Sequence, residues 1–95
     1  MNTKYVLVRT ESAGAFVGEL ADRKGSEVTL TEARRLWYWS GASSLSQLAM
    51  EGVKKPENCK FPCEVDRITL FGVIEIIDVT EAAKANIKAV PVWKQ

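Results

Sequence analysis

Short apolar runs alternate with turn residues in the first third of the chain. Residues 5–8 form one apolar run, which is followed by a turn at residues 11–14 and a second apolar run at residues 16–20. Two β-prone runs around a glycine-containing turn predict a β-hairpin. After a further turn at residues 23–26, residues 28–30 alternate apolar and polar positions, as a half-buried strand does. The pattern therefore predicts a three-stranded antiparallel meander.

Residues 68–77 are nearly continuous in apolar side chains. Strands that are buried on both faces have this composition. A single glycine within such a run, here Gly72, is typical of a bend or a bulge. We therefore expect buried strands in this segment, and we expect them at the centre of the core.

The spacing of capping residues predicts a short helix over residues 45–51. Ser44 and Gln47 have the spacing of a capping box, in which a side chain and a backbone N–H group bond at the start of a helix. Gly52 stands where a helix of this length ends.

A second helix is predicted to begin at Thr80 and to end before Pro91, with apolar residues on one face and lysines on another. Together the elements predict an α+β fold: a small antiparallel β-sheet or partly open barrel with two short helices. A chain of 95 residues is expected to form a single domain over residues 1–95.

The balance of charge changes the picture of possible partners. The chain has 13 basic and 12 acidic residues, a net charge of +1. A nearly neutral protein lacks the broad positive field that draws DNA or RNA, so no nucleic-acid partner is expected. Small domains bury a modest share of their surface, which favours self-association, and we expect a homo-oligomer.

The first residues lack the long apolar stretch of a signal peptide, and no run is long enough to span a membrane. We expect the protein to remain in the cytoplasm of the cell that makes it. In that reducing setting Cys59 and Cys63 are expected to stay free thiols. The chain contains no histidine, so neither a metal site nor a cofactor is expected.

Catalysis is not expected either. The usual general base is missing without histidine, and the sequence contains no nucleophile elbow, phosphate-binding loop or dinucleotide fingerprint. Acid–base chemistry by two carboxylates stays open, because sequence alone does not place the carboxylates relative to one another.

The segment from Ala33 to Gln47 concentrates arginines, aromatic residues and small polar residues. Residues 32–39 fit either a helix or a strand, and we favour a strand with Trp37 and Trp39 on one face. Paired guanidinium groups bind phosphate oxygens, aromatic rings stack on a base, and hydroxyls at a helix start bind anions. These residues are the candidate ligand-binding set: Arg34, Arg35, Trp37, Tyr38, Trp39, Ser43, Ser44 and Gln47.

The same residues also fit a purely structural interpretation. Trp37 and Trp39 would then fill the core or a subunit interface, and Ser44 would only cap its helix. The two arginines would lie over apolar surface with their charged ends in water. Both interpretations stay open at the level of sequence.

Five segments carry a resemblance to a known family: residues 28–30, 33–42, 44–49, 59–62 and 75–77. In these segments the chain resembles an uncharacterised family of small proteins from tailed phages and prophages. The resemblance implies a phage accessory protein made in the cytoplasm of the bacterial host, and such proteins often antagonise host defence. It implies no particular activity.

Together, the resemblance and the candidate residues lead us to expect a protein that sequesters a nucleotide immune signal of the cyclic dinucleotide or cyclic ADP-ribose type. The alternative is a non-enzymatic inhibitor or structural accessory subunit that uses the same aromatic and arginine residues to bind a host or phage protein.

Overall fold

The predicted hairpin and meander are three neighbouring strands of one larger sheet. In a computed structural model, which describes residues 4–94, five antiparallel strands lie in the order β4-β3-β2-β1-β5. Residues 1–3, part of the stretch assessed for a signal peptide, and Gln95 lie outside the described residues. The strands are β1 Tyr5–Thr10, β2 Ala15–Lys24, β3 Glu27–Leu36, β4 Val65–Leu70 and β5 Val73–Asp78.

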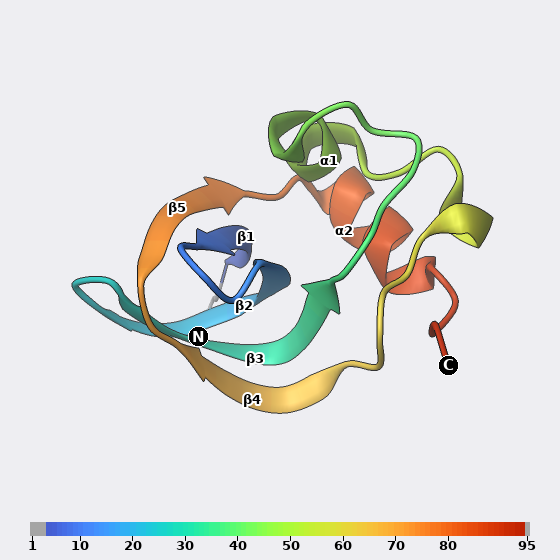
Figure 1. Cartoon of the computed structure of the whole chain (residues 1–95). Coiled ribbons are helices and arrows are strands. Elements are labelled where there is room, and N and C mark those ends of the chain that lie inside the picture. The colour runs from blue at the N-terminus through green and yellow to red at the C-terminus, as the bar shows by residue number, and fades with distance from the viewer. Residues whose placement is uncertain (1–3, 95) are drawn as a thin grey trace.

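The expected fold class is confirmed: the chain is a single α+β domain with an open antiparallel sheet and two short helices. The sheet curls so strongly that β5 and β4, at its two edges, approach each other in space (Figure 1). Residues 32–39 form strand and not helix, as we favoured, since β3 runs through Leu36 and Tyr38 forms an isolated antiparallel bridge with Lys60. Glu32, with φ 49°, interrupts the extended backbone of β3.

The prediction for residues 68–77 is wrong in one respect. The segment supplies parts of two separate strands, β4 and β5, which occupy opposite edges of the sheet and are joined by a turn at Phe71 and Gly72. An edge strand that buries only one face still needs apolar side chains on that face. Some apolar side chains of the segment, such as Ile74, remain exposed. The centre of the core is formed by β1, β2 and β3 instead.

Both predicted helices are confirmed. Helix α1 covers Leu45–Glu51 and helix α2 covers Glu81–Ala89, with a 3-10 turn, η1, at Pro56–Asn58. The hydroxyl groups of Ser44 and Thr80 accept hydrogen bonds from backbone N–H groups in the first turns of α1 and α2. No helix among residues 4–94 is long and apolar enough to cross a membrane.

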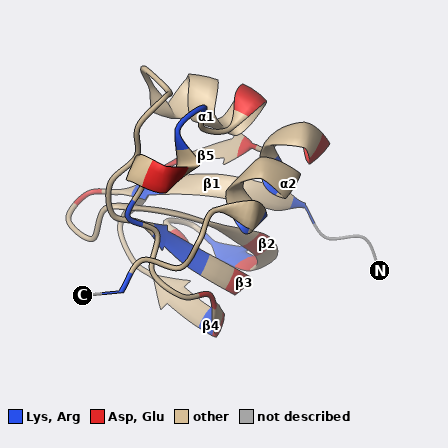
Figure 2. Ribbon diagram, turned by 90° about the vertical axis from the view of Figure 1, so that its right-hand side faces the viewer, with Lys and Arg blue, Asp and Glu red and all other residues tan. Residues whose placement is uncertain are grey.

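The curled sheet buries apolar side chains on both faces. On one face the side chains of β1 and β2 pack against α1 and α2, which lie side by side over the sheet (Figures 1 and 2). On the other face Val6, Val8 and Phe16 meet Leu30 and Leu70 inside the curl. The backbone of β1 is therefore enclosed, while the two edge strands face solvent on one side.

Candidate functional site

Arg34 and Arg35 point to opposite faces of β3, because successive side chains of a strand alternate. Arg34 is 4% exposed, and its guanidinium donates hydrogen bonds to four carbonyl oxygens over 2.9–3.2 Å. The acceptors are the carbonyl groups of Phe61, Pro62, Ile87 and Pro91. Burial lowers the pKa of Arg34. Arg34 therefore links the residues just before β4 to the end of α2 and the residue Pro91 beyond it. Its N–H groups donate to other parts of the protein itself.

The polar residues at the start of α1 bond to one another. The Ser44 hydroxyl accepts a bond of 3.1 Å from the Gln47 backbone N–H, which confirms the predicted cap. The Gln47 side-chain oxygen accepts bonds from the Ser43 N–H, at 2.8 Å, and from the Ser43 hydroxyl, at 2.7 Å. These three residues therefore form a local network at the start of a helix of only seven residues, and the Gln47 side chain also donates to Glu51 at 3.4 Å.

The three consecutive aromatic residues have three different surroundings. Trp39 is partly buried and packs against the core beneath the helices. Trp37 and Tyr38 are exposed, at 62% and 52%. The Tyr38 ring lies 5.9 Å from the Lys60 ammonium, which is also 5.6 Å from the Trp93 ring. Trp37 and Tyr38 are adjacent in the sequence and both exposed, but they contact different residues.

Trp37 stands between two shallow hollows. One, of about 310 Å³, is lined by the β1–β2 turn and by Arg35. The other, of about 380 Å³, is lined by the same turn, by Arg9 and by Trp39. Arg35 donates to the Ala13 carbonyl at 3.1 Å, and its guanidinium carbon lies 4.5 Å from the centre of the Phe16 ring. We call this region, comprising Arg9, residues 12–15 and residues 35–37, the Trp37 surface.

Arg9 and the β1–β2 turn were not among the candidate residues of the sequence. The register explains their position, since Arg9 pairs with Ala15 and Ala15 pairs with Leu36 across three neighbouring strands. The predicted hairpin contained this information: once β1 and β2 are paired, the end of β1 must lie beside the residues that follow β3. Arg9 also forms an exposed ion pair with Glu75 at 3.1 Å.

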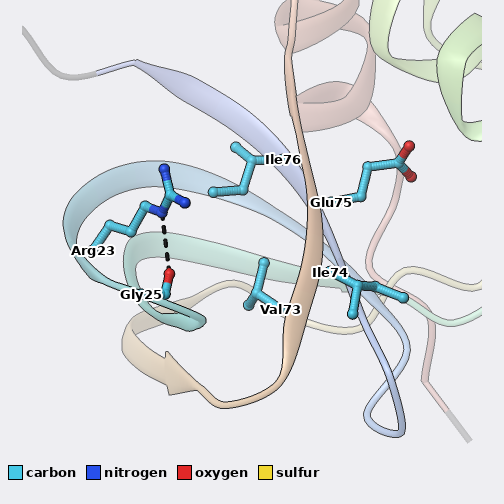
Figure 3. Close-up of a pocket in the computed structure, with 6 residues that line it drawn as sticks. All are labelled: Arg23, Gly25, Val73, Ile74, Glu75 and Ile76. Carbon is cyan, nitrogen blue, oxygen red and sulfur yellow. Dashed lines mark hydrogen bonds between the residues drawn. The ribbon is translucent and has the colours of Figure 1, made fainter.

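A second hollow region, of about 290 Å³, lies between the tip of the β2–β3 hairpin and β5 (Figure 3). Arg23 bonds to the Gly25 carbonyl at 3.1 Å, and its side chain and that of Ile76 lie on the same side of β5, whereas Glu75 points to the other side (Figure 3). Among residues 4–94, no three Cys, Asp or Glu side chains gather in a way that would hold a metal ion.

The hydroxyl of Tyr5 is buried beneath a cluster of charged side chains on α2. It is the one buried side-chain polar atom of residues 4–94 without a hydrogen-bond partner. The ammonium groups of Lys84 and Lys88 lie 5.2 and 5.8 Å from its ring. Burial raises the pKa of Tyr5 to about 12. These contacts hold α2 over the start of β1.

The two lysines of this cluster are paired with carboxylates. A hydrogen bond from Lys84 to Glu19, of 2.9 Å, raises the lysine pKa. Burial by itself would lower the pKa of Lys88, but hydrogen bonds to Glu32 and Glu64 outweigh it and raise that pKa. A raised lysine pKa contributes stability below the ordinary lysine pKa and loses it as pH rises through the folded value.

Replacing Tyr5 with phenylalanine is expected to leave the protein at least as stable at pH 7, because it removes an unpaired buried hydroxyl. In the wild type, the unfolded chain releases the tyrosine proton near pH 10, whereas the folded chain holds it to about pH 12. Wild-type stability should therefore fall by about 1.4 kcal/mol more per pH unit than that of Tyr5→Phe in this window. Urea unfolding at pH 7, 10 and 11 measures the difference. Tyr38→Phe, which changes an exposed tyrosine, should follow the wild type, and equal pH profiles for all three would contradict the assignment.

Comparison with known families places the chain in a group without an assigned activity. A family model described as a domain of unknown function, DUF6948, matches residues 3–87. The chain belongs to this family. All residues of the Trp37 surface lie within the DUF6948 match, as do all five strands. No curated protein and no solved structure matches the chain significantly.

Proposed function

We propose that this DUF6948 protein is a non-catalytic binding protein, and that the Trp37 surface takes a nucleotide. The observation that carries the proposal is the position of the Trp37 ring, which is 62% exposed between two hollows with a guanidinium group beside each. A base stacked on an exposed aromatic ring gains about 1–3 kcal/mol. The cations beside such a base are Arg35, which has one hydrogen bond, and Arg9, whose exposed ion pair with Glu75 a phosphate group would have to displace.

The geometry favours a compact ligand with more than one phosphate. The two arginines flank a single aromatic ring, and the whole chain carries a net charge of only +1. A long nucleic acid would require an extended basic surface. A cyclic dinucleotide or a cyclic ADP-ribose derivative presents a base and two phosphates within the size of one such site.

Within this proposal, the biological role is sequestration of a nucleotide immune signal by a phage accessory protein in the bacterial host cytoplasm. The phage assignment rests on the resemblance described above. Sequestration requires binding without chemistry, and a chain of 95 residues without a histidine suits that role. Arg34, Ser43, Ser44 and Gln47 are engaged within the protein, so the proposed site does not depend on them.

Native mass spectrometry with a panel of cyclic dinucleotides, cyclic trinucleotides and ADP-ribose derivatives tests the proposal. One class of nucleotide should bind in fixed stoichiometry and be released with unchanged mass. Trp37→Ala should weaken this binding about 5- to 150-fold, since a lost stacking contact is worth about 1–3 kcal/mol.

Tyr38→Ala is the matched control for this measurement. It removes the neighbouring exposed aromatic ring, which lies beside Lys60 and lines neither hollow. It should bind nucleotide like the wild type. Equal affinity of Trp37→Ala and wild type would contradict the site, and a ligand released with altered mass would contradict the absence of catalysis.

One observation favours the second candidate function, a non-enzymatic inhibitor or accessory subunit that binds a protein. Tyr38 and Val92 are exposed, at 52% and 47%, and the Lys60 ammonium lies near the rings of both Tyr38 and Trp93. Tyrosine and tryptophan are enriched at the centres of protein interfaces. A stoichiometric protein partner that is lost in Tyr38→Ala, together with no binding of any nucleotide, would establish this function instead.

A further inference from the structure

The two edge strands of the sheet each form a ladder on one side only, although the backbone N–H of Val73, at the start of β5, donates to the Ser26 carbonyl of the β2–β3 turn at 3.0 Å. Within residues 4–94, β4 pairs with β3 and β5 pairs with β1, and no ladder joins β4 to β5. The backbone N–H of Val79 donates to the Tyr5 carbonyl at 3.1 Å. Because antiparallel pairing alternates, the backbone groups of Ile76 and Asp78 point away from β1, toward the open side of β5.

Exposed apolar side chains gather at these same edges. Seven large apolar side chains of the described residues are exposed, and three of them belong to β4, β5 or the turn between them. The three are Val65, Phe71 and Ile74, which are 42%, 68% and 53% exposed. An unpaired edge with exposed apolar side chains is a template for another strand, and natural proteins protect such edges or use them.

Charged side chains that form no ion pair within the described residues lie beside both edges. The hollow along β5 is lined by Arg23, whose one hydrogen bond among residues 4–94 goes to the Gly25 carbonyl (Figure 3). Strand β4 carries Asp66 and Arg67, which are both exposed and form no ion pair within the described part of the chain. A β4 strand laid along β5 brings an unpaired carboxylate to the edge that has an unpaired guanidinium.

We propose that β4 of one copy pairs with β5 of the next copy, so that the chain forms a closed homo-oligomer with a continuous sheet. Pairing of β5 with β5, or of β4 with β4, would leave one edge open in every subunit. Pairing of unlike edges satisfies both edges in every subunit, and a repeated head-to-tail contact closes into a ring when its rotation permits. The proposal concerns a different surface from the Trp37 surface and does not depend on nucleotide binding.

Two variants block one edge each. Ile74→Lys places a charge on β5, and Val65→Lys places a charge on β4, where lysine opposes strand pairing. Both side chains are exposed, so each variant should keep the fold and its circular dichroism spectrum. Met50→Lys is the control, because Met50 is 59% exposed on α1, outside both edges.

Native mass spectrometry of these proteins gives the subunit count directly. Wild type and Met50→Lys should form the same discrete oligomer of two or more subunits, and each edge variant alone should be monomeric. A mixture of Ile74→Lys and Val65→Lys should form a 1:1 heterodimer, since one intact β4 edge and one intact β5 edge remain. The two subunits are distinguished by mass.

Three results would overturn the proposal. The first is a monomeric wild type at the concentrations that the measurement reaches. The second is an oligomer that both edge variants leave unchanged. The third is a homodimer of either edge variant, because Val65→Lys can dimerise only through β5 with β5 and Ile74→Lys only through β4 with β4.

Discussion

Replacing Arg34 with methionine is expected to lower the free energy of unfolding by about 3–5 kcal/mol. Methionine keeps much of the apolar volume of the side chain, but it cannot donate to the carbonyl groups of Phe61, Pro62, Ile87 and Pro91. These acceptors lie in a part-buried to buried setting, and unpaired buried carbonyls carry the full penalty of lost hydration. Since small domains are stable by about 5–15 kcal/mol, the loss is a large part of the total.

Arg35→Met is the matched control, because it changes the next residue of the same strand. Arg35 makes one hydrogen bond, to the Ala13 carbonyl, and is only partly buried. Its replacement should lower the free energy of unfolding by about 1 kcal/mol. Urea unfolding monitored by far-ultraviolet circular dichroism compares the two variants. Equal effects of the two substitutions would show that the four carbonyls are not held by Arg34.

The pair Arg34 and Arg35 shows where sequence reasoning reached its limit. Both guanidinium groups were assigned to one ligand, yet the strand that the same sequence favoured places adjacent side chains on opposite faces. The acceptors of Arg34 lie 27, 28, 53 and 57 residues away along the chain. A contact over such a separation depends on the whole fold, and no local pattern specifies it.

Features with local causes were predicted well. The hairpin of β1 and β2 and the starts of α1 and α2 depend on turn residues and on hydroxyl groups within three residues of the N–H groups that they accept from. The fold class follows from these elements. The Trp37 surface was only partly foreseen, because Arg9 joins Trp37 through the register of three strands.

The edge strands illustrate a further limit. The apolar run at residues 68–77 was interpreted as central, but a strand at the edge of a curled sheet also buries one face, as Ile68 and Leu70 do. The remaining apolar residues of such a strand can serve a second copy instead of the core. If the proposed pairing of β4 with β5 holds, both edges of each of these strands are hydrogen-bonded in the oligomer.

Replacing Gly52 with alanine is the second substitution with a large expected effect, about 3–5 kcal/mol of lost stability. Gly52 ends α1 with φ 79° and ψ −157°, a conformation that is essentially restricted to glycine. A Cβ atom there would also collide with the side-chain carboxamide of Asn86 on α2. That carboxamide bonds to both backbone groups of Val53, at 2.8 and 2.9 Å, so the collision would break the link between α1 and α2.

Gly25→Ala separates backbone strain from this collision. Gly25 also has a positive φ, of 61°, but a Cβ atom added to it would meet no heavy atom within 4 Å. It should lose only about 1 kcal/mol, the usual penalty of the left-handed conformation for alanine. Thermal and urea unfolding of the two variants give the comparison. A loss at Gly52 no larger than that at Gly25 would mean that the Asn86 carboxamide moves aside freely, and that the bonds from Thr80 to Ala49 and Met50 suffice to hold α1 to the start of α2.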